Sequence, residues 1–150
     1  MKIILQNYIN LNRILFSNSY TKSDVINEMI KISRDNGKVD DVERFKKALL
    51  RRESLMSTGI GYGIAIPHVK LDLVDEFFIT VFIHKKGVDW ESLDNKPAHL
   101  IFLIAGPENQ QEKYLRILAK LTLIIKSPEK RQKLVDCKTK YEVYEIFKDV

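Results

Sequence analysis

The sequence predicts a single α/β domain over residues 1–150, built on a central mixed β-sheet that is flanked by helices on both faces. Two segments, 77–83 (FFITVFI) and 100–105 (LIFLIA), are nearly continuous apolar runs rich in branched and aromatic residues. Strands that are buried on both faces have this composition. Segments with helical spacing of apolar residues come before and after these runs, which is typical of the α/β class. A length of 150 residues suits one compact domain.

The remaining elements follow from the spacing of apolar residues and from capping residues. Apolar residues at helical spacing predict helices at four places, namely residues 21–36, about 40–53, 115–125 and 141–147. Thr21 or Ser23 can cap the first of these helices, and Gly37 ends it. A short third strand is expected at residues 62–66.

Composition narrows the class of protein. Apolar residues make up 45% of the chain and charged residues 30%, as in globular proteins. The apolar runs are too short to cross a bilayer, and the opening residues MKIILQNYINLNR lack the features of a signal peptide. The lone cysteine, Cys137, allows no disulfide framework and no zinc-ligand spacing. We therefore expect a cytoplasmic protein without a metal site.

The positive net charge raises the question of nucleic-acid binding. The net charge is +5 and the isoelectric point is about 9.2, with basic clusters at residues 44–52 and 130–133. Acidic residues flank the first cluster on both sides, and the spacing favours solvated helix faces. We expect no nucleic-acid partner, and a salt titration of DNA binding would decide between the two interpretations.

The stretch STGIGYGIAIPH, residues 57–68, carries the most specific chemical signal. It differs from the dinucleotide motif GxGxxG, because its glycines alternate and a strand instead of a helix is expected after them. Alternating glycines let backbone N–H groups approach a phosphate closely, and neighbouring hydroxyl groups add donors. The residues expected to form such a phosphate-binding loop are Ser57, Thr58, Gly59, Gly61 and Gly63.

His68 ends this stretch directly after Pro67. The proline ring fixes its own φ and biases Ile66 toward an extended conformation, so the chain presents His68 in a defined direction. A neutral imidazole is a good nucleophile near pH 7, provided that a hydrogen bond to the other ring nitrogen fixes the tautomer. A structural histidine after a tight turn is the alternative interpretation.

Residues 52–68, RESLMSTGIGYGIAIPH, resemble the active-site signature of type-2 enzyme IIA domains. These domains belong to the fructose/mannitol branch of the bacterial phosphoenolpyruvate-dependent sugar phosphotransferase system. Within this branch, the residues of the signature are most similar to those of the nitrogen-regulatory members. The resemblance implies that His68 accepts a phosphoryl group from the histidine-containing phosphocarrier protein. It also implies that Arg52 lies close to His68, where its planar guanidinium could bind phosphate oxygens. For Arg51, and for Arg52 as the alternative, a cation near the end of a helix is a sufficient explanation.

Two positions depart from the family pattern. The family usually has a small residue after the active histidine, and Val69 in its place would narrow the approach of a partner. The family also commonly has a second histidine in an HLxxL pattern, which here reads YLRIL from Tyr114 onward. A phenol can donate a hydrogen bond to a phosphoryl oxygen, but it cannot carry positive charge.

The other histidines and the cysteine are expected to be structural. His84 and His99 each lie beside an apolar run, where a local partner at a strand edge is more typical than a catalytic role. His99 could act at His68 only if its strand end faced that residue. Cys137 lies in a charged segment without a second cysteine or a nearby histidine, and we expect an unreactive thiol.

Two functions are compatible with the resemblance. In the first, the protein is a phosphocarrier that passes the phosphoryl group from His68 to a cysteine of a IIB domain. In the second, phosphorylation of His68 controls binding to a partner protein and no sugar is moved. Both imply no cofactor other than the phosphoryl group derived from phosphoenolpyruvate, and contact with a membrane only indirectly, through a IIC partner.

Overall fold

A mixed β-sheet of six strands forms the centre of the structure over residues 2–150, which the computed structural model describes apart from the side chain of Asp149. The strands are β1 (Ile9–Phe16), β2 (Gly59–Gly61), β3 (Ile64–Ala65), β4 (His68–Lys70), β5 (Phe78–Val88) and β6 (Ala98–Gly106). The long strands β5 and β6 are antiparallel, and the order across the sheet is β1-β5-β6-β3-β2. β3 and β4 both pair in parallel with β6, so the chain that contains His68 follows the central strand.

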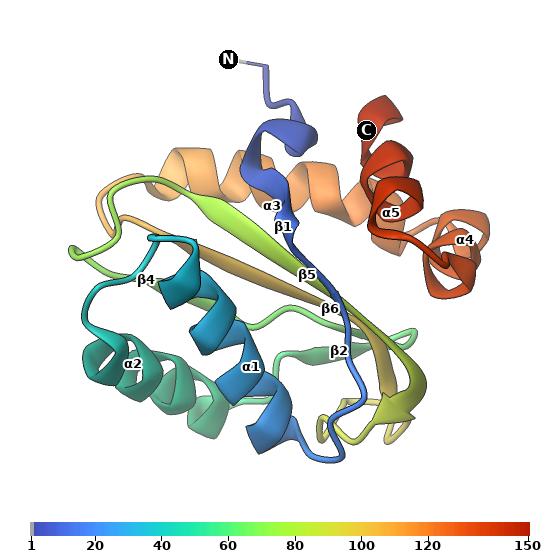
Figure 1. Cartoon of the computed structure of the whole chain (residues 1–150), viewed down its shortest axis with the longest axis horizontal. Coiled ribbons are helices and arrows are strands. Elements are labelled where there is room, and N and C mark those ends of the chain that lie inside the picture. Colours follow the sequence, from blue (N-terminus) through green and yellow to red (C-terminus); the bar gives the residue numbers. More distant parts are fainter. Residues whose placement is uncertain (1) are drawn as a thin grey trace.

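Helices cover both faces of this sheet (Figure 1). They are α1 (Lys22–Asp35), α2 (Val42–Leu55), α3 (Gln111–Ile125), α4 (Pro128–Asp136) and α5 (Lys140–Ile146), with 3₁₀ turns η1 (Leu5–Tyr8) and η2 (Phe147–Asp149). α1 and α2 lie on one face, while α3 and the C-terminal helices lie on the other. Side chains cap the helices at their first turns: Thr21 accepts from the backbone N–H of Asp24, and Asp41 accepts from that of Arg44.

The alternation of side chains along β5 divides the core into two layers. Phe78 and Phe82 pack with α1 and α2, whereas Ile79, Val81 and Ile83 pack with α3 and the C-terminal helices. Successive residues of a strand point to opposite faces, so a strand between two helical layers must be apolar at every position. This explains why β5 and β6 read as continuous apolar runs.

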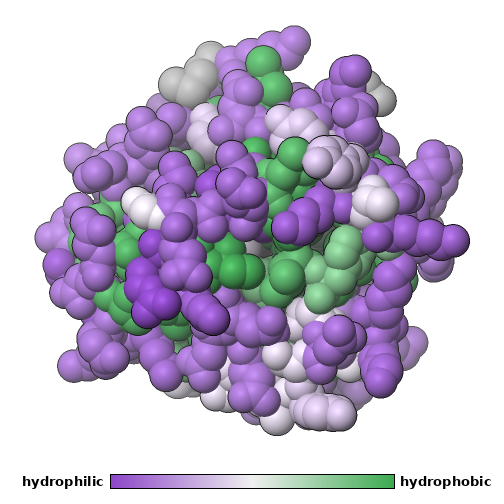
Figure 2. All heavy atoms as spheres, viewed as in Figure 1, coloured by the Kyte–Doolittle hydropathy of each residue, from purple (hydrophilic) through white to green (hydrophobic). Residues whose placement is uncertain are grey.

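Hydrophilic residues cover most of the face seen in Figure 2, and hydrophobic residues gather in patches between them. Among residues 2–150, no helix has the length and apolar character needed to cross a membrane.

The structure confirms the expected mixed sheet with helices on both faces, and the four expected helices correspond to α1, α2, α3 and α5. The sequence did not predict the strands β1, β2 and β4 or the helix α4. β1 is an edge strand whose exposed Asn10 and Asn12 interrupt its apolar pattern, and α4 buries only Leu134 among charged residues. The strand expected at residues 62–66 is shorter, because residues 59–65 form a hairpin of β2 and β3.

Candidate functional site

His68 is the first residue of β4, and its imidazole is half-buried. Pro67 precedes it, and the Pro67 carbonyl accepts a hydrogen bond from the backbone N–H of Ile104 in β6 at 3.0 Å. Nδ1 of His68 lies 3.0 Å from the carbonyl oxygen of Ile66. A carbonyl can only accept, so this contact places the ring proton on Nδ1. Nε2 is then left with the free lone pair.

Arg52, in the last turn of α2, supports the same tautomer from the other side of the ring. Its Nε lies 3.2 Å from Nε2 of His68, and its Nη1 donates to the carbonyl oxygen of Met56 at 2.7 Å. Because a guanidinium is always a donor, Nε2 must be the acceptor. The first contact places a proton on Nδ1 and the second excludes one from Nε2, so together they assign a neutral imidazole with its nucleophilic nitrogen facing Arg52.

Tyr114 borders the imidazole from a third direction, and Lys70 lies against the Tyr114 ring. Tyr114 lies in the first turn of α3, is 7% exposed, and has its ring centroid 5.8 Å from that of His68. Nζ of Lys70 lies 4.5 Å from the centroid of the Tyr114 ring and donates to Oε1 of Gln111. Lys70 was not expected at the site. Its position two residues after His68 on one strand was the available signal, because alternate residues share a face.

Burial is the main influence on the ionisation of the site. It lowers the pKa of His68 below its ordinary value near 6.5, and the positive charges of Arg52 and Lys70 act in the same direction. The hydrogen bond to Ile66 and the negative charge of Glu53 oppose this effect. Burial also raises the pKa of the Tyr114 phenol, partly offset by Arg52. At neutral pH the imidazole is therefore uncharged and the phenol keeps its proton.

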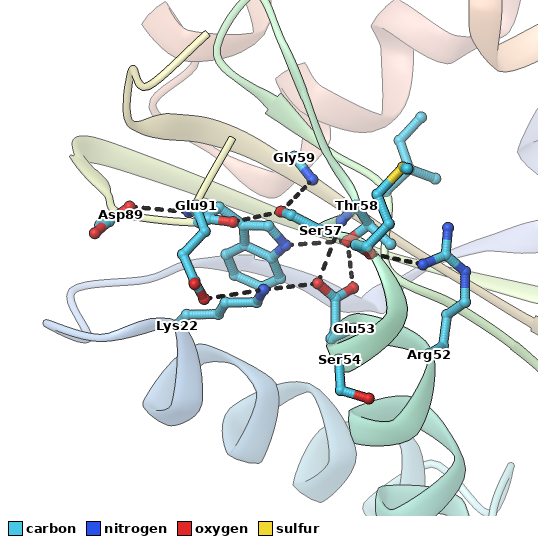
Figure 3. Close-up of polar contacts among 12 residues, drawn as sticks. Lys22, Arg52, Glu53, Ser54, Ser57, Thr58, Gly59, Asp89 and Glu91 are labelled. Atoms are coloured by element: carbon cyan, nitrogen blue, oxygen red, sulfur yellow. Dashed lines mark hydrogen bonds and ion pairs between the residues drawn. The ribbon is translucent and has the colours of Figure 1, made fainter. Parts of the chain in front are cut away.

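A buried polar network fixes the connection between α2 and β2, beside the site. Figure 3 shows the carboxylate of Glu53 between Lys22 and Thr58. Glu53 is 9% exposed, its Oε1 lies 2.8 Å from Nζ of Lys22, and it accepts from both the hydroxyl and the backbone N–H of Thr58. The indole of Trp90 also donates to the Thr58 hydroxyl, at 3.0 Å. The network holds the segment whose Met56 carbonyl anchors Arg52.

The first part of the glycine stretch does not offer a phosphate-binding loop, which corrects the expectation. The Ser57 hydroxyl donates to the Trp90 carbonyl at 2.6 Å, and both donors of Thr58 are directed to Glu53. The backbone N–H of Gly59 donates to Ser57 Oγ. These donors are therefore already used within the protein.

The second part of the stretch lies too far from His68. The carbonyl of Gly63 accepts from the backbone of His99 and of Leu100, at the start of β6. His68 pairs with Ile104 on the same strand. The offset of four residues corresponds to about 13 Å at the usual rise of a strand.

The glycines serve the hairpin instead. Gly61 and Gly63 have φ of +93° and +74°, values that favour glycine. A Cβ at Gly59 would lie 2.3 Å from Oγ of Ser92, so this position requires a close backbone approach.

The other candidate residues lie apart from His68 or point away from it. His84 is buried within β5 with Nε2 2.7 Å from the carbonyl of Ser19, and Nδ1 of His99 lies 3.0 Å from the carbonyl of His84. Burial raises the pKa of the Cys137 thiol. Val69 packs into the core with α1 and α2, so it does not narrow the approach to His68, contrary to expectation. Among residues 2–150, no three His, Cys, Asp or Glu side chains cluster as metal ligands would.

The fold and the histidine site match a family of phosphoryl-transfer proteins. Residues 7–150 match the family model described as "Phosphoenolpyruvate-dependent sugar phosphotransferase system, EIIA 2", and the chain belongs to this family. Its members are phosphoryl-transfer components of that system.

Both fructose-specific and nitrogen-regulatory proteins are among the relatives. The chain is 41% identical over 128 residues to a fructose-specific EIIABC component of Bacillus subtilis, covering 85% of this chain and 20% of that protein. It is 35% identical over 130 residues to a fructose-specific EIIA component of Haloferax volcanii, covering 87% and 84%. It is 32% identical over 100 residues to a nitrogen regulatory protein of Bradyrhizobium diazoefficiens, covering 67% and 65%. The chain thus spans about a fifth of the Bacillus protein.

Solved structures show the same architecture. The nitrogen regulatory protein IIA-Ntr of Neisseria meningitidis superposes with a TM-score of 0.89 at 26% identity, covering 97% of this chain and 99% of that chain. The mannitol IIA protein of Escherichia coli, solved in complex with a phosphorylated IIB protein, is alike in fold, with a TM-score of 0.81 at 22% identity and coverage of 95% and 99%.

Proposed function

We propose that this protein is a phosphocarrier whose His68 accepts a phosphoryl group and passes it on to a partner. The observation that carries this proposal is the pair of hydrogen bonds to His68, from Nδ1 to the Ile66 carbonyl and from Arg52 to Nε2. Together they leave Nε2 as the nucleophile at neutral pH. His84 and His99 also have a ring nitrogen at a carbonyl oxygen, but at His68 a guanidinium in addition faces the second ring nitrogen.

In the first transfer, the Nε2 lone pair attacks the phosphorus held by a histidine of the phosphocarrier protein. A bond from Nε2 to phosphorus forms, the bond to the donor nitrogen breaks, and its electron pair stays with the donor imidazole. The proton on Nδ1 remains hydrogen-bonded to Ile66, which stabilises the positive charge that the ring acquires.

Arg52 changes partners during this step. Its Nε occupies the Nε2 lone pair in the resting state, so the incoming phosphoryl group must displace it. Nη1 remains hydrogen-bonded to the Met56 carbonyl during this change. The guanidinium therefore stays near His68, where its other N–H groups can donate to the phosphoryl oxygens. Phosphoryl transfer depends mainly on such positioning and charge stabilisation.

In the second transfer, a thiolate of a IIB domain attacks the same phosphorus and the electron pair returns to Nε2. The fructose-specific relatives, at 41% and 35% identity, support a sugar-transport role. The protein would then act in the cytoplasm, meet the membrane only through a IIC partner, and need no resident cofactor or metal.

A regulatory role is the second candidate, supported by the overall likeness to IIA-Ntr. Phosphorylated His68 would then control binding to a target protein, because a phosphoryl group adds about two negative charges to the surface. Neighbouring genes for IIB and IIC proteins would favour transport over regulation.

The test is incubation with phosphoenolpyruvate, enzyme I and the phosphocarrier protein, followed by intact mass measurement and site mapping. We expect one acid-labile, base-stable phosphoryl group on His68, and none on His68→Ala. His99→Gln is the matched control, because this half-buried histidine lies at the other end of β6 and should leave phosphorylation unchanged. Equal phosphorylation of His68→Ala and the wild type would refute the assignment of the site.

A further inference from the structure

We propose that Lys70 is a second phosphoryl-binding cation, which acts with Tyr114 on the side of His68 that Arg52 does not cover. The assignment rests on the proposed phosphocarrier function and names a residue that stabilises the transferred group. Three observations carry it: the direction of the Lys70 side chain, the partners of its ammonium group, and the charge that the phosphoryl group brings.

The first observation is that β4 directs His68 and Lys70 to the same side. Val69, between them, packs into the core with α1 and α2, so its two neighbours point toward the layer that contains α3. The contacts agree with this direction, since both side chains meet Tyr114 of α3. Arg52 comes instead from the end of α2, which belongs to the opposite layer. His68 and Lys70 therefore share one side of β4, while the guanidinium of Arg52 comes from the opposite layer.

The second observation is that the Lys70 ammonium has only neutral partners. It lies over the Tyr114 ring and donates to the amide oxygen of Gln111. Among the described side chains no carboxylate forms an ion pair with it, in contrast to Lys22, which meets Glu53 and Glu91. An exposed amide is readily exchanged for a charged acceptor, and the flexible lysine stem lets the ammonium move without a change of the backbone.

The third observation is the charge balance at the site. A phosphoryl group carries close to two negative charges at pH 7, and Arg52 supplies one positive charge. Tyr114 cannot supply a second positive charge, because a protonated phenol is neutral. Burial raises the pKa of this phenol, so it stays protonated. Lys70 acts on the charge state of His68 already in the resting protein, where it lowers the pKa of the imidazole. This is the smallest of the influences on that pKa, but the flexible lysine stem lets the ammonium move toward a group bound to Nε2.

The experiment compares Lys70→Met, Lys70→Arg and Lys113→Met with the wild type in single-turnover phosphorylation. Lys113 is the matched control, because it also lies over a tyrosine ring, that of Tyr8, and its substitution changes the net charge equally. Two donors are used: the phosphorylated carrier protein, and phosphoramidate, a small donor that needs no docking surface. We expect the maximal rate of Lys70→Met to fall about 10- to 100-fold with both donors, the size of one charge-assisted contact. Lys70→Arg should retain most of the rate, and Lys113→Met should match the wild type.

Other outcomes separate the alternatives. A loss confined to the carrier protein, with a raised half-saturation concentration, would assign Lys70 to docking and overturn the proposal. An unchanged pKa of His68 in Lys70→Met, measured by NMR titration, would also contradict it, because removal of the cation should raise that pKa. If the wild type is phosphorylated and Lys70→Met is phosphorylated at the same rate, only the assignment of Lys70 is refuted. If neither donor phosphorylates the wild type, the phosphocarrier function itself is refuted, and the assignment with it.

Discussion

Replacement of Arg52 by alanine should slow phosphoryl transfer far more than it destabilises the fold. The change removes the donor at Nε2 of His68 and the anchor on the Met56 carbonyl. In the phosphorylated state it removes the guanidinium that we propose for the phosphoryl oxygens. His68 keeps its hydrogen bond to Ile66, so the tautomer and the nucleophile are preserved.

The magnitude follows from the two kinds of contact. A hydrogen bond to a charged group contributes about 1.5–3 kcal/mol. Since about 1.4 kcal/mol corresponds to a factor of ten, the transfer rate should fall about 10- to 150-fold. The contact with the Met56 carbonyl also involves the charged guanidinium, but it is exposed to solvent and contributes only about 0.5–1.5 kcal/mol to stability. Replacement of the half-buried Arg52 by alanine should therefore lower the free energy of unfolding by at most about 2 kcal/mol. This figure includes the loss of a positive charge that is favourable at the C-terminal end of a helix.

The assay is single-turnover transfer from the phosphorylated carrier protein, with urea unfolding measured on the same variants. Arg51→Ala is the control, because Arg51 carries the same charge one residue earlier in α2 but is exposed to solvent. Equal losses of rate in the two variants would refute the reasoning, since they would show that the general charge at the end of α2 matters and not the contact with His68.

Further predictions concern Tyr114, pH and Glu53. Tyr114→Phe should slow transfer about two- to twelvefold, the value of one neutral hydrogen bond, and Tyr114→His should restore or raise the rate; identical single-turnover rates would make Tyr114 a packing residue. The pKa of His68 is lower in the folded than in the unfolded state. As the pH falls below about 6.5, the unfolded chain therefore takes up a proton before the folded protein does. The free energy of unfolding decreases over this range until the pH reaches the folded-state pKa. Urea unfolding from pH 7.5 to 5 should show this loss for the wild type relative to His68→Gln, and parallel curves would contradict it. Glu53→Gln should lower the free energy of unfolding by about 1–3 kcal/mol, because it weakens a buried carboxylate network. Glu91→Gln is its control, since that side chain is 77% exposed and 3.7 Å from Lys22; equal losses would show that burial of Glu53 is unimportant.

The local signals in the sequence were sufficient for most of the fold. The apolar runs at 77–83 and 100–105 predicted the two central strands, because a strand between two helical layers has no polar face. The cap at Thr21 and the positive φ of Gly37 bound the first helix as expected. β1 escaped prediction, since an edge strand with exposed asparagines lacks a clear apolar pattern and gains its order by pairing with β5.

What the sequence determined by itself is His68 and the way it is presented: Pro67 and the extended residue before it are local constraints that act wherever the segment packs. The role expected for the glycines was wrong because their close neighbours, Ser92 and His99, come from other parts of the chain. Only the tertiary structure decided which side chains surround the imidazole. Arg52 reaches His68 from the end of α2, and Tyr114 reaches it from the start of α3. Their proximity depends on the pairing of β4 with β6 and on the packing of helices on both faces of the sheet, which are long-range interactions that local periodicity does not encode.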